Sequence, residues 1–191
     1  MYARPARTSS LTPTHRVVVG AAGRHRHLIG SEFDARHRSN VRAMPLCSYH
    51  VVARSAAPPE RVFELLADAT SWPLWAGPLI AHGSWDRQGD SAPGGVGAIR
   101  KIGRWPMFGR EQVVVSESPS HHAYTTLSGN PVRNYRADVR LTPDGDGTLI
   151  AWSGEFDPLV PGTGRLLEGT YRRLIGSFAR RLATYAEEHL H

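Results

Sequence analysis

The sequence predicts an α+β fold in which a curved antiparallel sheet of six to seven strands wraps around one long C-terminal helix. Short runs with strand-like alternation fill the middle of the chain, and an amphipathic helical stripe of about 25 residues closes it. No other segment could form a helix large enough to cover a sheet. A sheet of this size must curl to enclose a single helix, so we also expect a hollow between the two.

The first strand and the first helix are expected between residues 47 and 67. "CSYHVVARS" (Cys47–Ser55) has the composition of a strand, and the following Ala-Ala-Pro-Pro breaks it. Pro59 suits the first turn of a helix. Val62, Phe63 and Leu66 then share one face at helical spacing, which predicts a short amphipathic helix.

Two tryptophans, Trp72 and Trp75, follow this helix in "SWPLWAGPL", among prolines and a glycine. Burying a tryptophan removes about 150–250 Å² from water, so both rings are expected inside. They could simply seal one end of the sheet. We interpret Trp72 as structural packing and Trp75 as the residue that lines a cavity.

Six further strands are expected near residues 80–87, 95–102, 111–117, 122–129, 133–142 and 148–156. The clearest is 133–142, where four inward positions alternate with polar ones: Tyr135, Ala137, Val139 and Leu141. Pro-Asp-Gly-Asp-Gly at 143–147 predicts a hairpin turn into the last strand.

The C-terminal segment predicts the long helix. Seven apolar residues fall near one line at 100° per residue, namely Leu167, Tyr171, Leu174, Ile175, Phe178, Leu182 and Tyr185. Arginines and glutamates occupy the rest of the surface, so a single apolar face is expected to meet the sheet.

Charge divides the chain at residue 43. Residues 1–43 contain eight arginines against two acidic residues, whereas residues 44–191 contain fifteen basic and fifteen acidic residues. We therefore expect a disordered basic N-terminal extension at 1–43 and a folded domain at 44–191. The folded domain has no net charge and is not expected to bind nucleic acid. No apolar run reaches the ~18 residues that a membrane span needs.

The single cysteine, Cys47, excludes an internal disulfide framework and a cysteine-cluster metal site. We expect neither a metal nor a cofactor. One cysteine fits a reducing cytoplasm. Lys101 is the only lysine among 23 basic residues, and this arginine bias is typical of a GC-rich bacterial coding sequence.

Three separated strings resemble the START-like superfamily, also called SRPBCC, and most closely its polyketide cyclase/dehydrase branch. "VFELLADATSWPLWAG" (Val62–Gly77) is similar to the V-x-x-L-x-D-x-x-x-W-P-x-W signature of that branch. The hairpin at Ser128–Pro158 and the terminal helix follow in the same order. The resemblance spans roughly residues 46–189. It implies a helix-grip (START-like) fold, in which the sheet grips the helix around a deep internal cavity.

The candidate ligand wall consists of aromatic residues that should face inward, namely Trp75, Trp85, Tyr124, Tyr135, Trp152, Tyr171 and Phe178. For each one alone, ordinary core packing is the better interpretation. Together they exceed what one helix can cover, which favours a partly aromatic pocket. Arg100 is the candidate polar anchor, because an arginine that points inward needs a carboxylate or a ligand oxygen as its partner.

Other chemistry-bearing residues are interpreted as surface groups, and no catalytic residue is assigned. Strand parity places Glu155 opposite the inner face. His121 and His122 follow a Pro-Ser turn, and adjacent strand residues point apart, so we expect exposed turn histidines. The apolar break at Arg104–Gly109 could form a lid over the cavity, or a hairpin loop whose Trp105 and Phe108 fold back as a plug.

Three functions fit these residues. The first is binding of a hydrophobic small molecule, such as a lipid, a polyketide or another aromatic compound, as a cytoplasmic carrier or sensor. The second is a polyketide cyclase/dehydrase (aromatase)-type enzyme that uses the same cavity. The third is a protein-interaction module with a filled cavity. A cavity of several hundred Å³ would favour the first two. Assembly into a homodimer is left open.

Overall fold

The computed structural model describes residues 46–90 and 94–190. The expected N-terminal extension at 1–43 lies outside these residues. Among the described residues, no helix combines the length and the hydropathy that a membrane span requires.

The chain forms seven strands and three helices in the described ranges. In chain order these are β1 (Cys47–Ser55), α1 (Pro59–Ala67), α2 (Trp72–Trp75), β2 (His82–Arg87), β3 (Ile99–Arg104), β4 (Met107–Glu117), β5 (His121–Ser128), β6 (Val132–Asp144), β7 (Gly147–Pro158) and α3 (Gly164–Glu188). The strands form one antiparallel sheet in the order β1-β7-β6-β5-β4-β3-β2. The predicted α+β helix-grip fold is confirmed.

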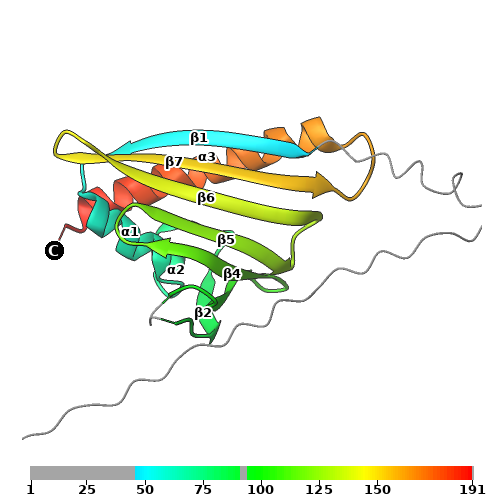
Figure 1. The fold of residues 1–191 in the computed structure, drawn as a ribbon, viewed down its shortest axis with the longest axis horizontal. Helices are drawn as coiled ribbons and strands as arrows, with labels where there is room; N and C mark the ends of the chain where they lie inside the picture. The colour runs from blue at the N-terminus through cyan, green and yellow to red at the C-terminus, as the bar shows by residue number, and fades with distance from the viewer. Residues whose placement is uncertain (1–45, 91–93, 191) are drawn as a thin grey trace, which may run out of the picture. The chain divides into compact units, whose positions relative to one another are not determined.

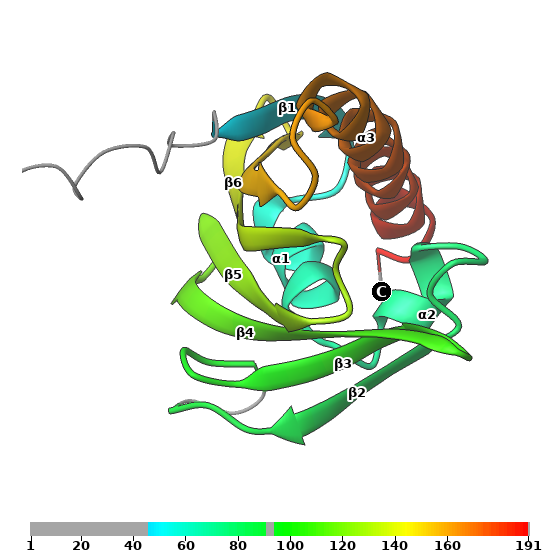
Figure 2. The ribbon, with the colours of Figure 1, turned by 90° about the vertical axis from the view of Figure 1, so that its right-hand side faces the viewer.

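The sheet is strongly curved, and the helices occupy its concave side. Figure 1 shows α3 running behind the long strands β1, β7 and β6. Figure 2, turned by 90°, shows the sheet bending from β1 around to β2, with α1 inside the bend and α3 across its open side. The long helix and the curled sheet therefore face each other across a shared interior.

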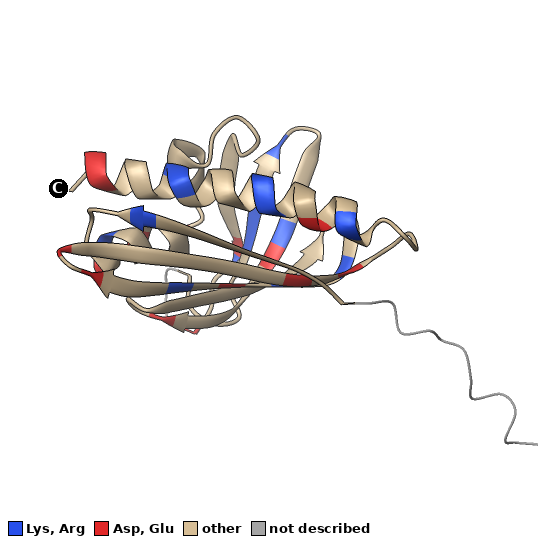
Figure 3. Ribbon diagram, turned by 90° about the horizontal axis from the view of Figure 1, so that it is seen from above, with Lys and Arg blue, Asp and Glu red and all other residues tan. Residues whose placement is uncertain are grey.

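The helix α3 buries the apolar stripe that the sequence predicted. Tyr171, Phe178 and Leu182 are buried, while Arg172 and Arg180 are exposed. Basic positions recur along the helix (Figure 3). Because the charged residues remain in water, α3 can pack on the sheet without burying an unpaired charge.

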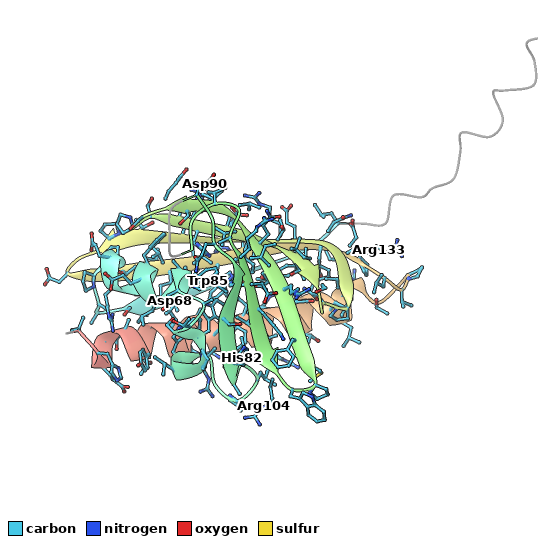
Figure 4. All side chains as sticks on the ribbon, turned by 90° about the horizontal axis from the view of Figure 1, so that it is seen from below. Asp68, His82, Trp85, Asp90, Arg104 and Arg133 are labelled. Atoms are coloured by element: carbon cyan, nitrogen blue, oxygen red, sulfur yellow. The ribbon has the colours of Figure 1, made fainter. Side chains whose placement is uncertain are left out.

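The hairpin between β3 and β4 is tighter than expected. The strands extend to Arg104 and Met107, which pair with each other, so only Trp105 and Pro106 remain in the turn. Trp105 is 82% exposed and does not fold back as a plug. The hairpin tip therefore projects into solvent, with Arg104 at the free end of the strands (Figure 4).

Gly154 on the inner face of β7 has no side chain, and the ring of Tyr49 occupies the space. Gly154 pairs with Tyr49 across β1 and with Ala137 across β6. A Cβ on Gly154 would overlap the Tyr49 hydroxyl. The absence of a side chain at Gly154 thus lets the buried Tyr49 ring lie across the strand.

Candidate functional site

A cavity of about 340 Å³ lies between the inner face of the sheet and α3. Its wall is mostly apolar and includes Trp72, Tyr124, Tyr135, Tyr171, Phe178, Ile80, Ile102, Leu167, Leu174 and Ile175. Leu79 and Met107 also line it and are exposed, whereas Tyr124 and Trp72 are buried. The cavity therefore runs from the surface into the core, and its volume lies in the range of small-molecule sites.

Four tyrosines form a connected cluster at the cavity: Tyr124, Tyr135 and Tyr171 line it, and Tyr49 lies behind Tyr135. The Tyr49 and Tyr135 hydroxyls are 2.5 Å apart, and the Tyr171 hydroxyl donates to Oδ1 of Asn130. The Tyr135 ring lies 5.4 Å from Tyr171 and 6.4 Å from Tyr124, centroid to centroid. These contacts hold the aromatic wall in a fixed arrangement.

Burial keeps these phenols protonated. Desolvation raises the pKa of Tyr171 to about 12, and raises the pKa values of Tyr49, Tyr124 and Tyr135 above their ordinary value. At neutral pH the cluster therefore offers neutral hydroxyls, which can donate and accept hydrogen bonds.

Arg100 is fully buried and does not line the cavity, contrary to the predicted position of a polar anchor. Its guanidinium lies between the rings of Trp72, at 4.2 Å, and Tyr124, at 4.4 Å. Nε and Nη2 both lie 2.8 Å from Oε2 of Glu111, although only Nε has hydrogen-bond geometry. The carboxylate partner that an inward arginine requires is thus Glu111, which does line the cavity.

Trp72 and Trp75 have the opposite roles to those predicted from the sequence. Trp72 lines the cavity, while Trp75 is buried outside its wall. Trp72 Nε1 donates to the carbonyl oxygen of Leu66 at 3.0 Å, and Trp75 Nε1 to that of Leu65 at 3.2 Å. Both indoles thus satisfy carbonyls that the end of α1 leaves without helical partners.

Trp85 and Trp152 are also outside the cavity wall. Trp85 packs its ring against Gly94 in the β2–β3 connection and lies toward Asp68, away from His82 at the other end of β2 (Figure 4). Trp152 is fully buried and meets Trp72 edge-on at 6.1 Å. Trp152 belongs to the core, whereas Trp85 is half-buried, and the cavity wall retains Tyr124, Tyr135, Tyr171 and Phe178 from the predicted set.

The expectation of exposed histidines is wrong, since both side chains are buried. As strand parity requires, they point apart. His121 Nε2 lies 2.9 Å from Asp138, whereas His122 faces Phe63 and Tyr124 and has no hydrogen-bond partner among the described residues. Desolvation, followed by the Arg100 charge, lowers the pKa of His122 to about 3.

The unfolding free energy should therefore fall as pH drops below 6.5, the ordinary histidine value, because the unfolded chain binds a proton that folded His122 refuses. This loss should reach about 1.5 kcal/mol between pH 6.5 and 5. Urea unfolding at both pH values should show that His122→Leu lacks this component. His50→Leu, at an exposed position on β1, should keep it. Equal pH dependence in wild type and His122→Leu would contradict a neutral buried ring.

A larger depression of about 680 Å³ is lined by residues of β1, β6 and β7 and by Arg172 of α3. Charged and polar groups line it, including Glu155, which is exposed as predicted. Arg136 and Asp138 in its floor already pair at 2.8 Å, and this bond lowers the pKa of the Asp138 carboxyl. The internal cavity is the stronger candidate for a hydrophobic ligand, because its wall is mostly apolar.

Sequence reasoning missed Glu111 and Asn130. Glu111 could have been found by folding the strands back about the turn at Trp105 and Pro106, because that register pairs it with Arg100. Asn130 lies in the short connection between β5 and β6. No local pattern indicated that its amide would meet Tyr171 on α3.

The comparisons with known proteins agree with this architecture. The family model described as polyketide cyclase/dehydrase and lipid transport matches residues 47–187. No curated protein sequence matches the chain significantly. Among solved structures, the protein XoxI from Bacillus cereus is similar with a TM-score of 0.62 and 18% identity, covering 76% of this chain and 99% of its own. Ara h 8.0201 is similar with a TM-score of 0.59 and 16% identity, covering 75% and 99%. These similarities concern the fold.

Proposed function

The chain belongs to the polyketide cyclase/dehydrase and lipid transport family, and we propose that it binds a hydrophobic small molecule in its internal cavity, as a carrier or sensor. The observation that carries the proposal is the cavity of about 340 Å³, which opens at Leu79 and Met107 and ends against buried aromatic rings. A protein-interaction module with a filled interior would have no such space.

The polar groups of the cavity favour binding over catalysis as its main role. The Tyr135 and Tyr171 hydroxyls are engaged with Tyr49 and Asn130, and the phenols stay protonated at neutral pH. Glu111 is held by Arg100. An enzyme of the polyketide cyclase/dehydrase type would need a group free to move a proton, and Glu111 is the candidate for that role. Mass spectrometry of a bound ligand before and after incubation distinguishes an unchanged cargo from a converted substrate.

Filling the cavity should abolish binding without unfolding the protein. Leu174→Trp places a large ring in the wall contributed by α3, and we expect the affinity for the neutral probe N-phenyl-1-naphthylamine to fall at least about tenfold. Fluorescence titration measures the affinity, and circular dichroism checks the fold. Leu166→Trp, at an exposed position on the same helix that does not line the cavity, is the matched control and should bind like wild type. The proposal fails if wild type does not bind the probe, or if Leu174→Trp binds it equally well.

A further inference from the structure

The cavity contains a single ionic group among the described residues that line it, the carboxylate of Glu111. Its side chain is 14% exposed, and Oε2 accepts the hydrogen bond from Arg100. The described contacts give Oε1 no hydrogen bond. One oxygen of a carboxylate, which can only accept, is therefore available to whatever enters the cavity.

Several of the other polar groups in the wall are satisfied within the protein. Tyr135 bonds Tyr49, and Tyr171 donates to Asn130. Asn130 Nδ2 donates to Thr126 at 3.4 Å, and the Thr170 hydroxyl donates to the Leu166 carbonyl at 2.9 Å. These groups have little left to offer a ligand, and Glu111 remains the strongest acceptor in the wall.

Tyr124 stands beside this acceptor. Val113, two residues from Glu111 on β4, pairs with Tyr124 on β5, and the Tyr124 ring contacts the same guanidinium that Glu111 binds. The neutral Tyr124 hydroxyl can donate as well as accept. The cavity wall next to Arg100 thus combines a charged acceptor with a neutral donor.

The charges of Glu111 and Arg100 restrict the functional groups that a ligand can carry. A ligand carboxylate would meet the Glu111 carboxylate, and like charges in a desolvated site repel each other. A ligand ammonium would meet a carboxylate whose charge Arg100 already balances at 2.8 Å, and would be repelled by that guanidinium. A neutral hydroxyl avoids both penalties, because it can donate to Glu111 and accept from Tyr124.

We propose that the cavity selects neutral, hydroxyl-bearing apolar ligands, namely phenols or alcohols, whose hydroxyl donates to Oε1 of Glu111. This inference rests on the proposed function and adds to it the functional group that the ligand must carry.

The test is a series with one ring system and four substituents. Isothermal titration of the full chain at pH 7 would compare 2-naphthol, 2-naphthoate, 2-naphthylmethylamine as its cation, and 2-methylnaphthalene. We expect 2-naphthol to bind at least about tenfold more tightly than each of the others, as expected for a hydrogen bond to a charged acceptor. Equal or tighter binding of the acid, the cation or the hydrocarbon overturns the inference.

The variant Glu111→Gln tests the residue itself. It leaves the Arg100 charge without a counter-ion, so the preference should shift from 2-naphthol to 2-naphthoate. Glu155→Gln, on the outer face of β7, is the control and should keep the wild-type order. If folded Glu111→Gln binds the four compounds in the same order of affinity as wild type, Glu111 does not select the hydroxyl. If this variant does not fold, the wild-type series decides alone.

The two proposals fail in different ways. If 2-methylnaphthalene and the other three compounds all fail to bind wild type, the hydrophobic cavity is not a binding site for such rings and both proposals fall. If the hydrocarbon binds and the hydroxyl adds nothing, the proposed function stands and the selectivity for hydroxyls is rejected.

Discussion

Glu111→Ala is expected to lower the free energy of unfolding by about 3–5 kcal/mol. Arg100 is fully buried, and Glu111 is its only carboxylate partner among the described residues. Removing that partner leaves an uncompensated charge between the rings of Trp72 and Tyr124. Urea denaturation with a fitted m-value measures the change.

The double variant Arg100→Met/Glu111→Leu distinguishes the effect of an unpaired buried charge from the effect of removing both charges. With both charges removed, the stability should return to within about 1 kcal/mol of wild type, or exceed it. Asp144→Ala breaks the exposed pair between Arg54 and Asp144, 2.7 Å apart, and should change stability by less than about 1 kcal/mol. If Glu111→Ala proves as mild as Asp144→Ala, Arg100 is not the buried charge that the structure describes.

Trp72→Ala should also destabilise the fold by about 3–5 kcal/mol. The ring lies 4.5 Å from Trp75 and 6.1 Å from both Trp152 and Phe178, and its Nε1 caps the Leu66 carbonyl. Truncation removes these contacts and leaves the Leu66 carbonyl with only the longer hydrogen bond from Arg100 Nη1, at 3.4 Å. Chemical denaturation at 25 °C measures the loss.

Trp105→Ala is the matched control for the same substitution. Because Trp105 is 82% exposed at the β3–β4 turn, its removal should change stability by no more than about 0.5 kcal/mol. Similar losses in the two variants would show that Trp72 is not packed as the structure describes.

Periodic patterns made the fold predictable from the sequence. The alternation through Tyr135, Ala137, Val139 and Leu141 correctly identified the inner face of β6, and the stripe through Tyr171 and Phe178 that of α3. Such patterns can be detected in a single sequence, because every turn of a helix and every second residue of a strand faces the same environment.

The positions of the site residues could not be predicted in this way, because they depend on contacts that do not repeat along the sequence. Trp72 and Trp75 lie on a single helical turn, and their indoles donate to the Leu66 and Leu65 carbonyls, contacts that the sequence pattern does not reveal. Arg100 was correctly expected to need a carboxylate, but the identity of that carboxylate follows from the β3–β4 register. His122 is buried because its ring packs against Phe63 of α1 and Tyr124, and its sequence neighbours do not indicate these contacts.

Because Gly154 has no side chain, the residue types at positions 154 and 49 depend on each other. Tyr49 occupies the space that a Cβ at this position would take, and its hydroxyl supports Tyr135. Any larger residue at 154 would require a smaller one at 49, and the wall formed by Tyr135 and Tyr171 would lose its backing. Residues 49 and 154 therefore have to change together, because the space on the inner face of these two strands holds only one large side chain.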